Sequence, residues 1–221
     1  MSYRKYKKRS SGNETGFHVK FLNDAQKEAY QSYKKSSVLF LMGVAGCGKT
    51  HMAVNLAAQS LINNEADKLV ITRPIVEAGE SLGYLPGTFQ EKVNPYMMPI
   101  YDCLDRMVGS NSATKDHILK KTEIIPLAFM RGRSLENRVC ILDEAQNASF
   151  EQLKLMLTRI GQDSKLIITG DPNQSDIGHK SGLVDMVDKI YDVEGVEVVN
   201  FEKSAIVRHP IVGRILKRLD G

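Results

Sequence analysis

The stretch that decides the fold is Gly43-Val-Ala-Gly-Cys-Gly-Lys-Thr50, a full G-x-x-x-x-G-K-[ST] pattern. The apolar run SVLFLM enters it from residue 37, and the helical pattern HMAVNLAAQSL leaves it from residue 51. A glycine-rich turn between a strand and a helix lets backbone N–H groups converge on phosphate oxygens. Both flanks argue against the alternative, a Gly-rich turn that ends in Lys-Thr by chance. The pattern predicts a phosphate-binding loop made by Gly43, Ala45, Gly46, Cys47, Gly48, Lys49, Thr50 and His51.

The last residues of this loop have separate expected roles. Lys49 is expected to reach the β- and γ-phosphates of a nucleotide, and the Thr50 hydroxyl is expected to coordinate Mg²⁺. Cys47 stands where Ser or Thr is frequent, but that position binds phosphate mainly through its backbone N–H.

A second signal is the run Val139-Cys-Ile-Leu-Asp-Glu-Ala-Gln146. Four apolar residues place Asp143 at the carboxyl end of a buried strand, where open α/β sheets bind ligands. Asp143 is suited to hold Mg²⁺ through water, and Glu144 is suited to polarise the attacking water in hydrolysis. The alternative is an acidic pair at the start of a helix, which the helix dipole favours. The phosphate loop makes the catalytic interpretation the better one.

A third strand ends in Ile168-Thr-Gly-Asp-Pro-Asn-Gln174. Gly-Asp-Pro-Asn is by itself a good turn. Gln174 adds an amide that can orient water or contact the γ-phosphate from a neighbouring strand. We therefore expect several strand ends to converge on one nucleotide.

The rest of the chain alternates apolar strand patterns with helical ones, which indicates an α/β fold with a mostly parallel, doubly wound sheet and helices on both faces. No internal repeat is visible. The predicted strands are Val38–Met42, Leu69–Thr72, Val139–Leu142, Leu166–Thr169 and Val196–Phe201. The predicted helices are Thr50–Ile62, Phe150–Ile160, Gly182–Ile190 and Ile211–Leu219.

The length of 221 residues suits one domain, which we place at 14–221, with an insertion at 75–137 that is expected to hold helices of its own. The first 13 residues carry five cations and no acid, which is typical of a flexible basic arm. The arm has two open interpretations, non-specific phosphate binding and a solubility tail. The net charge of +4 conceals an acidic body, because residues 14–202 hold 25 acidic and 20 basic residues.

The composition also argues against several classes of protein. No apolar run approaches the roughly 18 residues of a membrane span, and the N-terminus lacks a secretory signal pattern. Three widely spaced cysteines argue against a disulfide framework and favour a reducing cytoplasm. The five histidines show no metal-ligand spacing, so no structural metal site is expected.

The motifs GVAGCGKT, ITRP, SLGYLPG, FMRGR, ILDEAQN, ITGDPNQSD and VRHPIV, in this order, resemble the motif set of the PhoH family of P-loop ATPases. This family is a single-lobe relative of superfamily-one helicases, and the similarity runs from about Phe21 to Leu219. The resemblance implies a RecA-like core, ATP and Mg²⁺ as cofactors, ATP hydrolysis and a role in RNA metabolism. It also implies a bacterial or phage-encoded protein that acts in the cytoplasm.

The resemblance assigns further residues. Gln26 matches the glutamine that reads the adenine edge, and Arg208 matches an arginine that contacts the γ-phosphate. Arg131 and Arg133 compete with Arg208 for that role, and they are equally suited to bind RNA phosphate. Arg73, in Thr72-Arg73-Pro74, matches a segment that contacts the nucleic-acid backbone.

These observations predict an Mg²⁺-dependent ATPase coupled to RNA or another single-stranded nucleic acid, with RNA helicase activity as an extension. The alternative is a nucleotide-switched, oligomeric RNA- or protein-binding module with slow hydrolysis. A small-molecule kinase shares the phosphate loop but fits Asp143-Glu144 and GDPNQ less well. A helicase-type site normally takes arginines from a second lobe, so a single lobe predicts a homo-oligomeric ring, with a hexamer favoured by the resemblance.

Overall fold

The computed structural model describes residues 21–75, 98, 101–103, 105, 112–201 and 218. Within these residues the chain forms one six-stranded sheet in which every strand pairing is parallel. The strands, in the spatial order β3-β2-β4-β5-β1-β6, are Thr122–Pro126, Lys68–Arg73, Arg138–Leu142, Lys165–Gly170, Val38–Gly43 and Val196–Phe201. The predicted α/β fold with a parallel sheet is confirmed.

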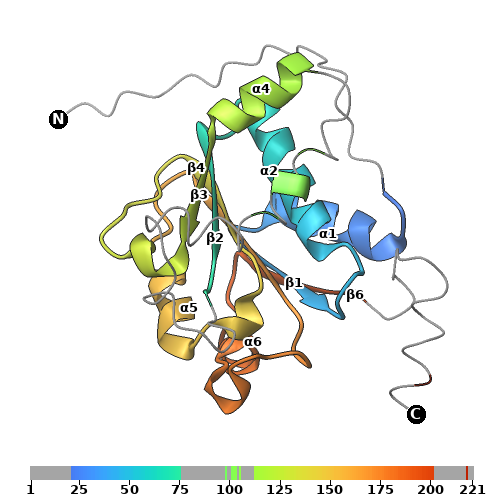
Figure 1. The fold of residues 1–221 in the computed structure, drawn as a ribbon, viewed down its shortest axis with the longest axis vertical. Coiled ribbons are helices and arrows are strands. Elements are labelled where there is room, and N and C mark those ends of the chain that lie inside the picture. The colour runs from blue at the N-terminus through green and yellow to red at the C-terminus, as the bar shows by residue number, and fades with distance from the viewer. Residues whose placement is uncertain are drawn as a thin grey trace, which may run out of the picture.

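Helices cover both faces of the sheet, as Figure 1 shows. One face packs against α1 (Asp24–Lys35) and α2 (Lys49–Ile62), and the other against α5 (Phe150–Leu157) and α6 (Leu183–Ile190). Short 3-10 helices join some of these elements: η2 (Leu127–Met130), η3 (Ala145–Asn147) and η4 (Gly178–Lys180).

The four inner strands, β1, β2, β4 and β5, are nearly continuous apolar runs because both of their faces are buried. Along β1, Leu39 and Leu41 point into the α1/α2 core, whereas Phe40 and Met42 point into the α5/α6 core. All four side chains are at most 5% exposed. This alternation fixes the register, because a slip by one residue would exchange the two cores.

The segment between β2 and β4 differs from the sequence-based prediction. It contributes α4 (Ser112–Lys120) and also the edge strand β3, which the sequence analysis did not assign. Four of the five β3 residues are only half-buried, so the strand lacks the apolar run by which the others were found. The N-terminal arm, much of the 75–137 segment and, apart from residue 218, the predicted helix Ile211–Leu219 lie outside the described residues. No helix in the described part of the chain is long and apolar enough to span a membrane.

Candidate nucleotide-binding site

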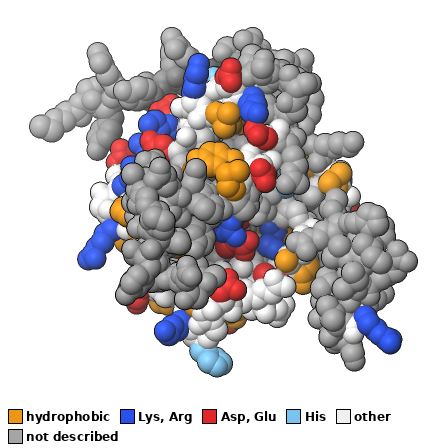
Figure 2. All heavy atoms as spheres, viewed as in Figure 1, with side chains coloured by type: hydrophobic (Ala, Val, Ile, Leu, Met, Phe, Trp, Pro, Cys, Tyr) orange, Lys and Arg blue, Asp and Glu red, His pale blue; other side chains and the backbone are white. Residues whose placement is uncertain are grey.

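A cavity of about 520 Å³ opens at the carboxyl edge of the sheet, a size typical of a small-molecule site. Parallel strands make this convergence possible, because their carboxyl ends all meet at one edge. Figure 2 shows acidic and basic side chains side by side near the centre of one face. The predicted residues that line the cavity are Gln26, Ala45, Gly46, Gly48, Lys49, Thr50, His51, Arg73, Asp143, Glu144 and Gln174.

The loop between β1 and α2 wraps around the Lys49 ammonium. Lys49 Nζ donates to the carbonyls of Gly43 at 2.7 Å and Val44 at 2.8 Å, and it lies 3.7 Å from Cys47 Sγ. Gly46 and Gly48 both adopt positive φ, at 84° and 90°, which is the conformation that turns backbone N–H groups inward. This backbone conformation suits the phosphate loop that the sequence predicts.

Two predicted loop residues support the loop from outside the cavity. Gly43 has φ 147°, and a Cβ there would lie 2.2 Å from the carbonyl oxygen of Phe201 in β6. Only glycine allows β6 to approach β1 so closely. Cys47 is fully buried in the α1/α2 core, which agrees with a backbone role at this position.

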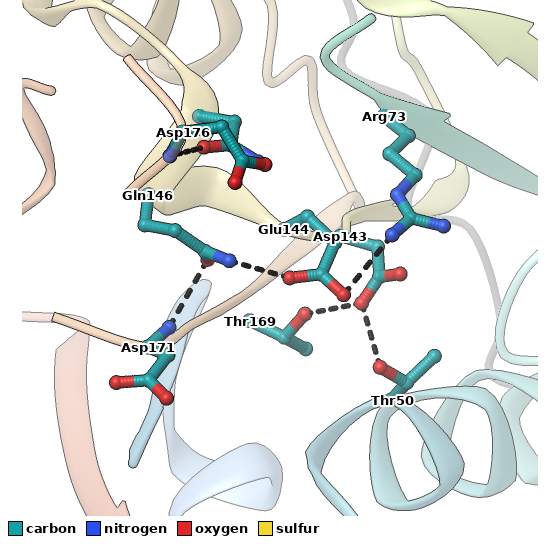
Figure 3. A network of polar contacts seen from close by, with 9 residues as sticks. Thr50, Arg73, Asp143, Glu144, Gln146, Thr169, Asp171 and Asp176 are labelled. Atoms are coloured by element: carbon teal, nitrogen blue, oxygen red, sulfur yellow. Dashed lines mark hydrogen bonds and ion pairs between the residues drawn. The ribbon is translucent and has the colours of Figure 1, made fainter. Parts of the chain in front are cut away.

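Asp143 is the polar centre of the site (Figure 3). Its Oδ1 accepts hydrogen bonds from the Thr50 hydroxyl at 2.7 Å and the Thr169 hydroxyl at 2.6 Å. The side chain is buried, since the residue is 2% exposed. Among the described residues, no three His, Cys, Asp or Glu side chains gather as a metal cluster. Thr50 and Asp143 instead offer two oxygen ligands. So few protein ligands suit Mg²⁺, because this ion keeps several of its water ligands when it binds to a protein.

Glu144 follows Asp143 with a left-handed backbone, φ 54° and ψ 44°. This conformation is uncommon for a residue with a Cβ and costs about 1 kcal/mol or more. Both carboxylate oxygens are engaged: Arg73 Nη2 lies 3.1 Å from Oε1, and Gln146 Nε2 lies 2.5 Å from Oε2. Thr72 in β2 pairs with Leu142, the last residue of β4. Arg73 comes one residue after Thr72 and Glu144 two residues after Leu142, so the pairing brings Arg73 and Glu144 close together.

Besides Thr169, two further residues of this network, Gln146 and Asp171, were not singled out from the sequence. The amide of Gln146 donates to Glu144 and accepts from the backbone N–H of Asp171 at 3.1 Å. Asp171 Oδ2 in turn accepts from the backbone N–H of Ala45 at 2.9 Å, and its Oδ1 accepts from Asn173 N at 3.0 Å. A hydrogen-bonded chain thus connects the phosphate loop to Arg73, and Figure 3 shows the part of it that runs from Asp171 through Gln146 and Glu144. Their place in the runs DEAQ and GDPNQ was the only sequence signal for them.

Gln26 lies in the first turn of α1, which begins after the Asn23 cap. The residue is 2% exposed, and its Oε1 accepts from the backbone N–H of Leu22 at 2.8 Å. Its Nε2 is buried and has no hydrogen-bond partner among the described residues. A Cβ added at Gly48 would lie 3.2 Å from that nitrogen, so the amide stands directly beside the phosphate loop. An unsatisfied buried donor in a cavity wall is a fit for a ligand acceptor.

The remaining arginines do not share one position. Arg131 and Arg133 are exposed and do not line the cavity. Arg133 lies 2.9 Å from Glu123 on the edge strand β3, and hydrogen bonds from Lys68 and Arg133 hold the pKa of Glu123 below its usual value. Arg208 lies outside the described residues. Of the candidate arginines within the described part of the chain, the structure brings Arg73 alone to the cavity.

A sequence model described as PhoH-like protein matches residues 18–220. The chain belongs to the PhoH-like family. It is 41% identical to the PhoH-like protein of Bacillus subtilis over 217 residues, 97% of this chain and 68% of that protein. It is 46% identical to a PhoH-like protein of Synechocystis over 87% of this chain and 59% of the relative. Protein PhoH of Escherichia coli is 40% identical over 88% of this chain and 56% of its own length.

This PhoH-like chain therefore spans roughly 56–68% of the length of these three relatives. Among solved structures, the large terminase of a thermophilic bacteriophage is similar, with a TM-score of 0.55 and 13% identity over 88% of this chain and 49% of that one. At this identity the likeness concerns the fold alone. Membership of this family, together with the G-x-x-x-x-G-K-[ST] loop, indicates a P-loop nucleotide-binding protein.

The hydrogen bonds of Asp171 make a testable contribution to the order of the phosphate loop. Asp171→Ala removes the acceptor of Ala45 N and Asn173 N, and we expect the free energy of unfolding to fall by about 1–3 kcal/mol. Asp171→Asn keeps one acceptor oxygen and is the matched control with a smaller loss. Urea unfolding followed by circular dichroism measures both. Equal stability of wild type and Asp171→Ala would contradict a structural role for this carboxylate.

Proposed function

We propose that this PhoH-like protein hydrolyses ATP with Mg²⁺ and that RNA binding is coupled to this hydrolysis. The observation that carries the proposal is the meeting of Lys49, Thr50, Asp143 and Glu144 in one cavity at the carboxyl edge of the sheet. A cation, a hydroxyl–carboxylate pair and a second carboxylate are the side chains that phosphoryl transfer to water requires.

Each side chain has a distinct task in this proposal. The backbone of the loop and Lys49 bind the phosphates and neutralise their charge. Thr50 and Asp143 would hold Mg²⁺, which supplies further neutralisation of the phosphate oxygens. Glu144 accepts the proton of the attacking water, and Gln174, which also lines the cavity, orients that water or the γ-phosphate.

A second candidate, a nucleotide-controlled binding module with slow hydrolysis, is favoured by one observation. Lys49 is bound by loop carbonyls, and Glu144 is engaged by both Arg73 and Gln146. Lys49 must exchange these carbonyls for a phosphate before it acts, and the two donors on Glu144 lower its basicity toward water. The rate of ATP turnover with and without single-stranded RNA separates the candidates, because a coupled ATPase is stimulated and a pure switch is not.

Removal of either charged catalytic group should abolish turnover. Lys49→Ala is expected to lower kcat/KM at least about 100-fold, because it removes the preorganised positive charge that stabilises the transferred phosphoryl group. Glu144→Gln is expected to lower kcat about 100-fold or more while ATP binding persists. Phosphate release measures turnover, and a fluorescent ATP analogue measures binding. Lys68→Ala, which removes a surface cation paired with Glu123 at 3.0 Å, is the control that keeps full activity. Full activity of Lys49→Ala would refute the proposed site.

The buried amide of Gln26 should give selectivity for the base. A bidentate amide matches the donor–acceptor edge of adenine, and a buried polar group left unpaired is costly. We expect Gln26→Ala to weaken ATP binding about tenfold and to reduce the preference for ATP over GTP. Gln26→Glu keeps the size but replaces the donor by an acceptor, so it should be as damaging. Competition titrations with ATP and GTP measure the ratio, and an unchanged ratio would contradict the assignment.

We further propose that the active form is a homo-oligomeric ring, with a hexamer favoured. The exposed Arg131 and Arg133, or Arg208, would then approach the site of a neighbouring subunit in trans. Size-exclusion chromatography with light scattering, in Mg²⁺ and an ATP analogue, is expected to show an assembly. Mixing Glu144→Gln with Arg131→Ala/Arg133→Ala should restore partial turnover if these arginines act across subunits. A monomer that hydrolyses ATP at full rate would exclude the trans arginine.

A further inference from the structure

The contact between Arg73 and Glu144 occupies the carboxylate that the proposed reaction needs. Arg73 Nη2 approaches Oε1 at 3.1 Å, and Gln146 Nε2 holds Oε2 at 2.5 Å. Gln146 is itself 5% exposed and fixed by Asp171 N, so the Oε2 side of the carboxylate is anchored. Oε1 is therefore the oxygen whose basicity the Arg73 guanidinium lowers, and release of Arg73 makes it a better acceptor for the proton of water.

The strength of the contact suits a reversible restraint. The Arg73 side chain is 21% exposed and that of Glu144 is 37% exposed, so solvent screens their attraction. Ion pairs this exposed shift an equilibrium by only a few-fold. A ligand that offers Arg73 a better acceptor can displace Glu144, whereas a fully buried pair would resist exchange.

The surroundings of Arg73 indicate the chemistry of that ligand. Arg73 is the last residue of β2, and it is paired with Pro126, the last residue of β3. The 3-10 helix η2 begins at the next residue and carries Phe129, which is 51% exposed, and the exposed Arg131 follows it. Guanidinium groups bind phosphates in a bidentate manner, and exposed aromatic rings stack on bases. This edge of the sheet fits a single-stranded nucleic acid.

We propose that Arg73 is a nucleic-acid sensor: the phosphate backbone of single-stranded RNA competes with Glu144 for the Arg73 guanidinium and so releases Glu144 to orient water. This inference rests on the proposed ATPase function and supplies its coupling to RNA. Arg73 acts through Glu144 and is a positioning residue. Gln146 keeps the released carboxylate in the cavity by its remaining hydrogen bond.

A binding experiment tests the competition without any ATP turnover. Fluorescence anisotropy of a labelled oligo(U) RNA, about 12 nucleotides long to cover one single-strand binding site, is measured for wild type, Arg73→Ala, Glu144→Gln and the double variant. Glu144→Gln removes the competing charge and should tighten RNA binding about threefold, whereas Arg73→Ala should weaken it. In the Arg73→Ala background, Glu144→Gln should have no effect. The same effect of Glu144→Gln in both backgrounds, or no effect in either, would overturn the proposal.

Turnover gives the second readout. Arg73→Ala should raise the RNA-free rate of ATP hydrolysis a few-fold and reduce stimulation by oligo(U), with Arg73→Lys intermediate because it keeps the charge without the planar fork. Lys68→Ala is the matched control, since it also breaks a pair between a β2 cation and a glutamate. A folded Arg73→Ala variant with a lower RNA-free rate would overturn the proposal. If wild type itself does not hydrolyse ATP, the ATPase assignment fails, and the binding experiment still decides the competition.

Discussion

The carboxylate of Asp143 is the constraint on which the site depends. Its Oδ1 accepts hydrogen bonds from the hydroxyls of Thr50 and Thr169. These bonds connect the first turn of α2 with the carboxyl ends of β4 and β5. A buried carboxylate is tolerated only where its acceptors are satisfied. These two hydroxyls therefore hold the phosphate loop, through Thr50, at a set position against the sheet. Because Glu144 follows Asp143 directly in the chain, the same hydrogen bonds also help to position Glu144.

The polar network has two parts, one that is buried and stays hydrogen-bonded and one that is more exposed and can change partners. Asp143, Gln146 and Asp171 are each at most 5% exposed and make hydrogen bonds with backbone N–H groups or hydroxyls, and Gln146 also donates to Glu144. Arg73 and Glu144 are more exposed and meet as an ion pair at 3.1 Å. Buried hydrogen bonds stay formed, while a screened ion pair exchanges readily. The site can therefore keep its geometry while one of its members changes partner.

The parallel sheet and the phosphate loop could be predicted because they depend on local patterns: apolar runs buried on both faces, and glycines at positive φ before Lys49. The strand β3 could not, since its sequence TEIIP has only two consecutive isoleucines between polar residues and a proline, whereas β6, the other edge strand, still carries three valines. The importance of Gln146 and Asp171 also escaped prediction, because their hydrogen bonds join loops far apart in the chain. Arg131 and Arg133 have the right chemistry, but only the fold shows that they lie away from the cavity of their own chain.

The close approach of Gly43 to Phe201 has a consequence for the order of events during synthesis. The phosphate loop comes early in the chain. Its first glycine, Gly43, contacts Phe201 in β6, the last strand of the described sheet along the chain. A nascent chain on the ribosome holds the loop sequence long before it holds β6. β1 can pair with β6 only after β6 has been synthesised. The contact that stabilises the start of the phosphate loop therefore forms only when all six strands have been translated.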